Sequence, residues 1–158
     1  MSLPVRALLA VALLCVALGA EAAWPFGWGE KEKQAEPIVW LNDVQQALDS
    51  AAVTGKPLVV YVTSEGCRYC RKMEHDTWAD AGVAGRIRGG FTPLRINAST
   101  DPEAVKTLQI RAFPTTVVLS PAGRGLGAAQ GYLPAEKLTA LLDTFAEPKT
   151  AAAPSRTR

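Results

Sequence analysis

Two patterns of apolar positions alternate along the chain, one typical of strands and one typical of helices. Residues 58–63 form an almost continuous apolar run, which predicts a strand buried on both faces. Residues 91–97 alternate between apolar and polar side chains, as strands do. Pro121-Ala122-Gly123 separates two further strand-like runs and predicts a hairpin turn. The predicted strands are 38–40, 58–63, 91–97, 115–119 and 126–131.

The segments between these strands carry apolar residues at helical spacing. Asn42 or Asp43 is a suitable cap for the first helix, and Pro102 stands in the first turn of a later one. The predicted helices are 44–53, one that begins after Cys67 and extends to about Arg88, one that opens at 101–103, and 134–145. The order βαβαβαββα implies an α/β fold, with a mixed sheet and helices on both of its faces.

The start of the chain has the composition of an export signal. Arg6 supplies a positive charge, residues 7–20 form an apolar run, and Ala20-Glu21-Ala22 is a small-x-small cleavage site. We therefore predict a signal peptide over residues 1–22 that is cleaved near Ala22. The apolar run is short for a transmembrane helix, so we expect an exported protein rather than one held by this segment in a membrane. Cys15 lies in the signal and would be removed with it.

Composition divides the rest of the chain into a domain and two flanking segments. Residues 23–37 mix aromatic, glycine and charged residues and are predicted to be flexible; their Trp24-Pro25-Phe26-Gly27-Trp28 cluster is either a docking motif or a cover for a neighbouring groove. Residues 147–158 are rich in alanine, proline and charge, which predicts a disordered tail. Residues 38–146 suit one domain. The net charge of +2 is scattered and gives no indication of a nucleic-acid or membrane surface.

Cys67-Arg68-Tyr69-Cys70 lies between the predicted strand 58–63 and a predicted helix. This position puts the first thiol at a helix N-terminus, where free N–H groups and the helix dipole stabilise a thiolate. The second thiol follows one turn later on the same face, close enough to form a small disulfide ring. Such a short loop constrains little of the unfolded chain, and two cysteines with a single histidine fall short of the four ligands of structural zinc. The pattern favours a redox-active pair.

Two further features accompany the cysteine motif. They are the segment Ile110-Arg111-Ala112-Phe113-Pro114-Thr115-Thr116 and a glycine before the last helix, Gly131. With them the chain resembles the thioredoxin superfamily over residues 38–146. The resemblance implies a thioredoxin-like fold in which the Phe113–Pro114 bond is cis and faces the cysteines. It also implies that Phe113 and Pro114 form a substrate-binding groove, in which the exposed backbone of Phe113 pairs with an extended substrate chain.

The residues around the cysteines are closer to exported thioredoxin-like proteins than to cytosolic thioredoxin. They are similar to the periplasmic C-terminal domain of the transmembrane thiol:disulfide interchange protein. Gly66 stands where a tryptophan usually precedes the first cysteine, and Arg68-Tyr69 replace the usual Gly-Pro. The buried aspartate and lysine that assist proton transfer in thioredoxin would fall at Tyr61 and near Pro93, so we expect that relay to be absent.

The two cysteines are expected to have different roles. Cys67, at the helix N-terminus, is the predicted nucleophile, and Cys70 is the predicted resolving thiol that attacks the mixed disulfide. The positive charge of Arg68 stabilises the thiolate and makes the disulfide more oxidising. Tyr69 either contacts substrate or shields the sulfurs.

No cofactor other than the cysteine pair, and no metal, is expected. Arg71 follows Cys70 where covalent haem attachment needs a histidine. His75 lies roughly 140° around the helix from Cys70 and should point away from the sulfurs. Glu74 and Asp76 are expected on a solvated helix face.

These observations predict a periplasmic thiol:disulfide oxidoreductase that acts on cysteine-containing exported proteins, more in the reducing direction. It is expected to be a monomer that exchanges electrons with a membrane-bound redox partner. Three alternatives stay open: a dithiol oxidase of the same fold, a metallochaperone that holds Cu(I) between Cys67 and Cys70, and a non-catalytic adaptor that uses the Phe113-Pro114 groove. An isomerase is less expected, because the superfamily's isomerases dimerise through an extra domain for which a chain of this length is too short.

Overall fold

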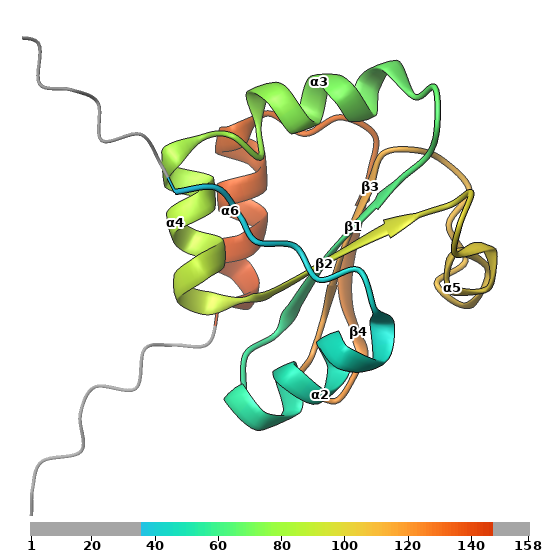
Figure 1. Cartoon of the computed structure of the whole chain (residues 1–158). Coiled ribbons are helices and arrows are strands. Elements are labelled where there is room, and N and C mark those ends of the chain that lie inside the picture. Colours follow the sequence, from blue (N-terminus) through green and yellow to red (C-terminus); the bar gives the residue numbers. More distant parts are fainter. Residues whose placement is uncertain (1–35, 147–158) are drawn as a thin grey trace, which may run out of the picture. The chain divides into compact units, whose positions relative to one another are not determined.

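The computed structural model describes residues 36–146, and Figure 1 shows their arrangement. The predicted signal peptide, most of the predicted flexible segment and the predicted tail lie outside these residues. Within them, no helix is long and apolar enough to cross a membrane. The elements in chain order are α2 (Val44–Thr54), β1 (Leu58–Thr63), α3 (Arg68–Asp76), α4 (Ala81–Gly90), β2 (Thr92–Asn97), α5 (Pro102–Thr107), β3 (Thr115–Leu119), β4 (Gly125–Gln130) and α6 (Ala135–Phe145).

The strands form one mixed sheet in the order β2-β1-β3-β4. Strand β1 pairs with β2 in parallel and with β3 antiparallel, and β3 pairs with β4 antiparallel. In this register Tyr61 of β1 lies opposite Arg95 of β2 and Thr116 of β3. The predicted α/β architecture with a mixed central sheet is confirmed.

Strand β1 is the centre of the core and is buried along its whole length. Because successive side chains of a strand point to opposite faces, it contributes to two separate apolar clusters. Val59 and Tyr61 belong to the cluster that includes residues of α3, α4 and α6, whereas Leu58, Val60 and Val62 belong to the one that includes residues of α2. Figure 1 shows α4 and α6 side by side, away from α2. Helices therefore cover both faces of the sheet, as predicted.

The prediction of a strand over residues 38–40 is wrong. The pairing there is a single bridge formed by Leu41, whose N–H donates to Pro93 O at 3.0 Å and whose carbonyl accepts from Arg95 N at 2.8 Å. Ile38 and Trp40 pack with their side chains on the core cluster of α3, α4 and α6. Their apolar character reflects this side-chain burial and not a ladder of backbone hydrogen bonds.

The predicted single helix from Cys67 to about Arg88 is two helices, α3 and α4. The break follows from two polar side chains. The Thr77 hydroxyl donates to Leu133 O at 2.6 Å, and the Asp80 carboxylate accepts from Val83 N at 2.9 Å and caps a new helix. Asparagine, aspartate, serine and threonine compete with helical backbone in this way, and they are favoured as caps.

Candidate redox site

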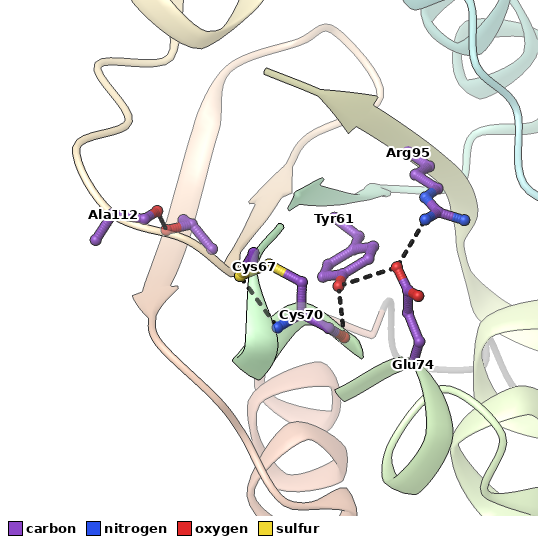
Figure 2. The surroundings of a disulfide bond; sticks show 7 residues. Tyr61, Cys67, Cys70, Glu74, Arg95 and Ala112 are labelled. Atoms are coloured by element: carbon purple, nitrogen blue, oxygen red, sulfur yellow. Dashed lines mark hydrogen bonds and ion pairs between the residues drawn. A yellow bond between two sulfur atoms is a disulfide. The ribbon is translucent and has the colours of Figure 1, made fainter. Parts of the chain in front are cut away.

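A disulfide joins Cys67 and Cys70, with a Cα–Cα distance of 5.2 Å. Cys67 is the N-cap residue of α3, and its Sγ accepts a hydrogen bond from the Cys70 backbone N–H at 3.1 Å, as Figure 2 shows. The turn from β1 into this helix includes Gly66 at a φ of +70°, a left-handed conformation that favours glycine. A thiolate at position 67 would therefore receive a backbone N–H bond and the favourable field of the helix N-terminus.

The two sulfurs differ in access. Cys70 is buried, with 2% of its surface exposed, whereas Cys67 is half-buried. Between them, Arg68 and Tyr69 are exposed, and Tyr69 exposes 61% of its surface. A sulfur of another protein can thus approach Cys67 and not Cys70, which is the asymmetry that a nucleophile and a resolving thiol require.

The second predicted motif lies at the same end of the sheet. Thr115, the first residue of β3, pairs with Val62 near the end of β1, so the segment before Thr115 lies at the end where the cysteines follow β1. The Phe113–Pro114 peptide bond is cis. Phe113 is half-buried and packs, like Cys67, on the core cluster of α3, α4 and α6.

Two hydrogen bonds hold the turn that carries Phe113 and Pro114. The Thr115 hydroxyl donates to Ala112 O at 2.7 Å, which is drawn in Figure 2, and Gly131 N donates to Pro114 O at 2.7 Å. Within residues 36–146, the N–H and C=O groups of Phe113 have no backbone hydrogen-bond partner. This leaves a donor and an acceptor available to an extended chain.

A partly buried polar cluster lies behind the second cysteine (Figure 2). The Tyr61 hydroxyl donates to Cys70 O at 3.1 Å and lies 3.5 Å from Glu74 Oε1, which accepts from Arg95 at 2.6 Å. Burial is the main cause that raises the pKa of Tyr61 to about 12. Glu74, expected on a solvated helix face, is 36% exposed, and its carboxylate is in addition bound by Arg95 and close to the Tyr61 hydroxyl.

This cluster was not predicted, although the amino-acid sequence contains two signals of it. Tyr61 is the one residue with a polar group within the apolar run from Leu58 to Val62, and Glu74 follows Cys70 by one helical turn. Arg95 is brought to them by the parallel register of β1 and β2, which the local pattern does not reveal.

A cavity of about 300 Å³ adjoins this cluster. Its walls include the rings of Trp40, Tyr61 and Trp78, and the Trp40 and Trp78 rings meet edge to face with centroids 5.0 Å apart. Glu74 and Arg95 line its polar side. The cavity is thus lined by Tyr61, the residue whose hydroxyl donates to Cys70 O, and by the two charged residues beside it.

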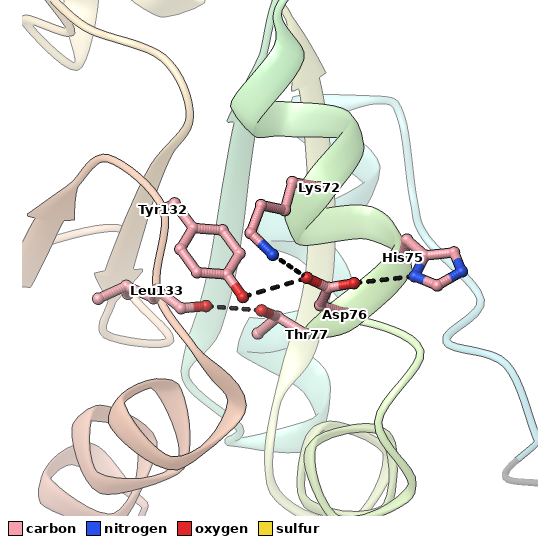
Figure 3. Close-up of polar contacts among 6 residues, drawn as sticks. All are labelled: Lys72, His75, Asp76, Thr77, Tyr132 and Leu133. Atoms are coloured by element: carbon pink, nitrogen blue, oxygen red, sulfur yellow. Dashed lines mark hydrogen bonds and ion pairs between the residues drawn. The ribbon is translucent and has the colours of Figure 1, made fainter.

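On the outer side of α3, an exposed charged cluster connects this helix to the segment before α6 (Figure 3). Lys72 donates to Asp76, His75 Nδ1 lies 2.8 Å from Asp76 Oδ1, and the Tyr132 hydroxyl donates to Asp76 Oδ2 at 3.4 Å. The Lys72 bond is the main cause that lowers the pKa of Asp76 to about 2. His75 is 90% exposed, as expected. In the described part of the chain, histidine, cysteine and carboxylate side chains form no group of three or more that could hold a metal ion.

Comparison with known proteins agrees with this arrangement. Residues 44–146 match the family described as a thioredoxin-like domain. The chain belongs to this thioredoxin-like family. A search of curated protein sequences finds no match.

Solved structures with a similar fold include thioredoxins and bacterial oxidoreductases. A thioredoxin from Thermus thermophilus is 24% identical, with a TM-score of 0.62 over 69% of this chain and 87% of that one. A DsbH oxidoreductase is 15% identical, with a TM-score of 0.62 over 71% of this chain and 87% of that one. The oxidised C-terminal domain of DsbD from Neisseria meningitidis is 19% identical, with a TM-score of 0.58 over 68% of this chain and 99% of that domain. At these identities the similarity shows that the thioredoxin-like fold is shared.

Proposed function

We propose that the protein is a thiol:disulfide oxidoreductase that reduces disulfides of cysteine-containing exported proteins. One observation carries the proposal: a disulfide caps the N-terminus of α3, with one sulfur accessible and the other buried. The thioredoxin-like family and the sequence features of an export signal support it. We propose the periplasm as its compartment on the basis of the predicted signal over residues 1–22.

The proposed reaction has two exchange steps. The Cys67 thiolate attacks one sulfur of the substrate disulfide, a bond forms between Cys67 and the substrate, and the other substrate sulfur leaves as a thiolate that takes up a proton. Cys70 then loses its proton and attacks Cys67 Sγ, which forms the Cys67–Cys70 disulfide and releases the second substrate thiol. Two electrons pass from the enzyme dithiol to the substrate disulfide. A partner protein with a dithiol, which we propose to be membrane-bound, returns two electrons to the enzyme.

The surroundings of the cysteines match these steps. The N–H of Cys70 and the dipole of α3 stabilise the Cys67 thiolate before attack and again when the partner's dithiol has reduced the enzyme. The free backbone groups of Phe113 are placed to pair with the substrate chain beside its disulfide. Burial of Cys70 keeps it from reacting with a second substrate before it resolves the first.

The proposal is tested by trapping the mixed disulfide between Cys67 and its substrates. A Cys70→Ala variant lacks the resolving thiol, so covalent adducts between Cys67 and substrate proteins should accumulate and be identified by mass spectrometry. Cys67→Ala is the matched control and should trap none. The absence of adducts, together with no reduction of insulin disulfides by the reduced wild-type protein, contradicts the proposal. Retention of one Cu(I) per chain in that case supports a metallochaperone instead.

Whether the protein reduces or oxidises its substrates is tested separately, by equilibrating the Cys67–Cys70 couple with glutathione. A reduction potential near about −270 mV supports a reductase, as in thioredoxin, and one near about −120 mV supports a dithiol oxidase. Biological function retained in a variant that lacks both thiols would indicate an adaptor.

A further inference from the structure

Three exposed arginines stand on the two segments that carry the disulfide and the Phe113-Pro114 turn. Arg68 and Arg71 are in α3, and Arg111 lies two residues before Phe113. In the described part of the chain, none of the three forms an ion pair or a side-chain hydrogen bond. Their charges are therefore available to another molecule.

The arginines come from two segments that both lie at the cysteine end of the sheet. Arg71 follows it by one helical turn, since Arg71 N donates to Cys67 O at 3.2 Å, and residues at this spacing share a helix face. Arg111 lies in the segment that leads into Thr115, and Thr115 pairs with Val62 near the end of β1 that the cysteines follow. Any protein whose sulfur reaches Cys67 has to approach these charges.

The carboxylates of α3 do not neutralise the charges of the three arginines. Glu74 is held by Arg95 at 2.6 Å, and Asp76 is held by Lys72 and His75. Glu65, exposed in the turn before Cys67, is the nearest other acid in sequence. The three arginines are thus set against one acid, Glu65, which leaves an excess of positive charge on the segments around Cys67.

The arginines are also placed against the preference of the helix itself. The first turn of α3 contains no acid, and Arg68 and Arg71 lie close to the positive end of its dipole and three residues apart. Like charges in this position destabilise a helix. A group of residues that breaks a local rule without a structural gain marks a functional surface.

We propose that the arginine surface, formed by Arg68, Arg71 and Arg111, selects partner proteins whose reactive cysteines are flanked by aspartate or glutamate. This inference rests on the proposed exchange reaction and names its substrate class. Complementary charges accelerate encounter, and like charges suppress wrong partners. Tyr69, exposed and next to Arg68 in the chain, offers the apolar contact.

Three model substrates test the inference. They are disulfide-linked peptides of equal length in which the cysteines are flanked by glutamate, by glutamine or by lysine. Each rate of reduction by the reduced protein is divided by the rate with dithiothreitol, because flanking charges also change the pKa of the peptide thiols. At low salt, the Glu peptide should react about 10-fold faster than the Gln peptide, and the Lys peptide more slowly than either. The differences should nearly vanish at about 1 M salt, where charges are screened beyond about 3 Å.

Charge-removing variants identify the surface. In the triple variant Arg68→Gln, Arg71→Gln, Arg111→Gln, the ratio of the Glu rate to the Gln rate should fall to about 1. This ratio cancels any change in the reactivity of Cys67. The matched control is Arg124→Gln, an exposed arginine in the turn between β3 and β4, which lies at the other end of the sheet because Leu119 pairs with Leu58. It should leave the ratio unchanged.

The outcomes separate this inference from the proposed function. Equal rates with the three peptides at low salt overturn the inference and leave the proposed function intact. A ratio that persists in the triple variant also overturns it. If no peptide is reduced, the proposed function is wrong and the inference fails with it.

Discussion

The hydroxyl of Tyr61 donates a hydrogen bond to the backbone carbonyl of Cys70 across 3.1 Å. This bond joins the central strand of the sheet to the helix that carries both cysteines (Figure 2). Since Tyr61 is 1% exposed, its hydroxyl has no access to bulk water and depends on Cys70 O and Glu74 for partners. The position of the second cysteine is therefore tied to the core.

Removal of this hydroxyl should weaken the fold. Tyr61→Phe deletes the bond to Cys70 O and should lower the free energy of unfolding by about 1 kcal/mol, measured by urea denaturation. The control is Tyr69→Phe, whose hydroxyl is on an exposed ring, and which should change stability by less than about 0.5 kcal/mol. Equal effects of the two variants would contradict a structural role for the buried hydroxyl.

The buried hydroxyl of Tyr61 should also titrate at a higher pH than an exposed tyrosine. Burial raises the pKa of Tyr61 to about 12 from 10.0, because the folded protein disfavours the charged phenolate. Its contribution to stability is fully present below pH 10.0 and is lost as the pH rises towards about 12. The ultraviolet absorbance of tyrosinate should show a transition near pH 12 that is missing in Tyr61→Phe. The same transition in the variant would assign it to another tyrosine.

The apolar pattern predicted the central elements well because burial determines them. Strand β3 has the predicted bounds, 115–119, and β1 those of the run 58–63. The same pattern was wrong for residues 38–40, since an apolar residue reports that it is buried and not that its backbone is paired. The extended helix was wrong because Asp80 offers a cap that interrupts a run of otherwise helical spacing.

From the spacing of residues alone, the candidate site was predictable only where it is local, and the Phe113-Pro114 turn was expected from the resemblance to the thioredoxin superfamily. The position of Cys67 at a helix N-terminus follows from a strand, a short turn and a helix that are consecutive in sequence. The contact of Glu74 with Arg95 depends on the register of two strands separated by two helices. Long-range register is not contained in the spacing of apolar residues, so this half of the site required the structure.

The pair formed by Glu74 and Arg95 should contribute modestly to stability. Both side chains are more than a third exposed, at 36% and 41%, so solvent screens their attraction. A double-mutant cycle with Glu74→Gln and Arg95→Met should give a coupling free energy of about 0.5–1 kcal/mol that decreases with salt. The control cycle uses Arg86 and Asp143, an exposed pair at 2.8 Å, and should give a smaller value. No coupling between Glu74 and Arg95 would show that the contact is energetically neutral.

Asp76 should titrate at unusually low pH. The hydrogen bond from Lys72 is the main cause that lowers its pKa to about 2 from 3.8. Because the folded pKa is depressed, the associated stability is present above pH 3.8 and is lost as the pH falls towards about 2. Nuclear magnetic resonance titration of the Asp76 carboxyl should show this value, and Lys72→Met should return it towards 3.8. An unchanged pKa in the variant would exclude Lys72 as the cause.

The pairing of Thr115 with Val62 determines when the proposed redox site is assembled during folding. The cysteines and the Phe113-Pro114 turn are far apart in sequence, and the zipping of two antiparallel strands is what unites them. In a nascent or thermally unfolded chain, the two thiols are consequently not activated and the Phe113-Pro114 turn is not placed beside them. Catalytic competence should then appear and vanish together with the cooperative folding of the sheet, which makes turnover a sensitive reporter of whether the domain is intact.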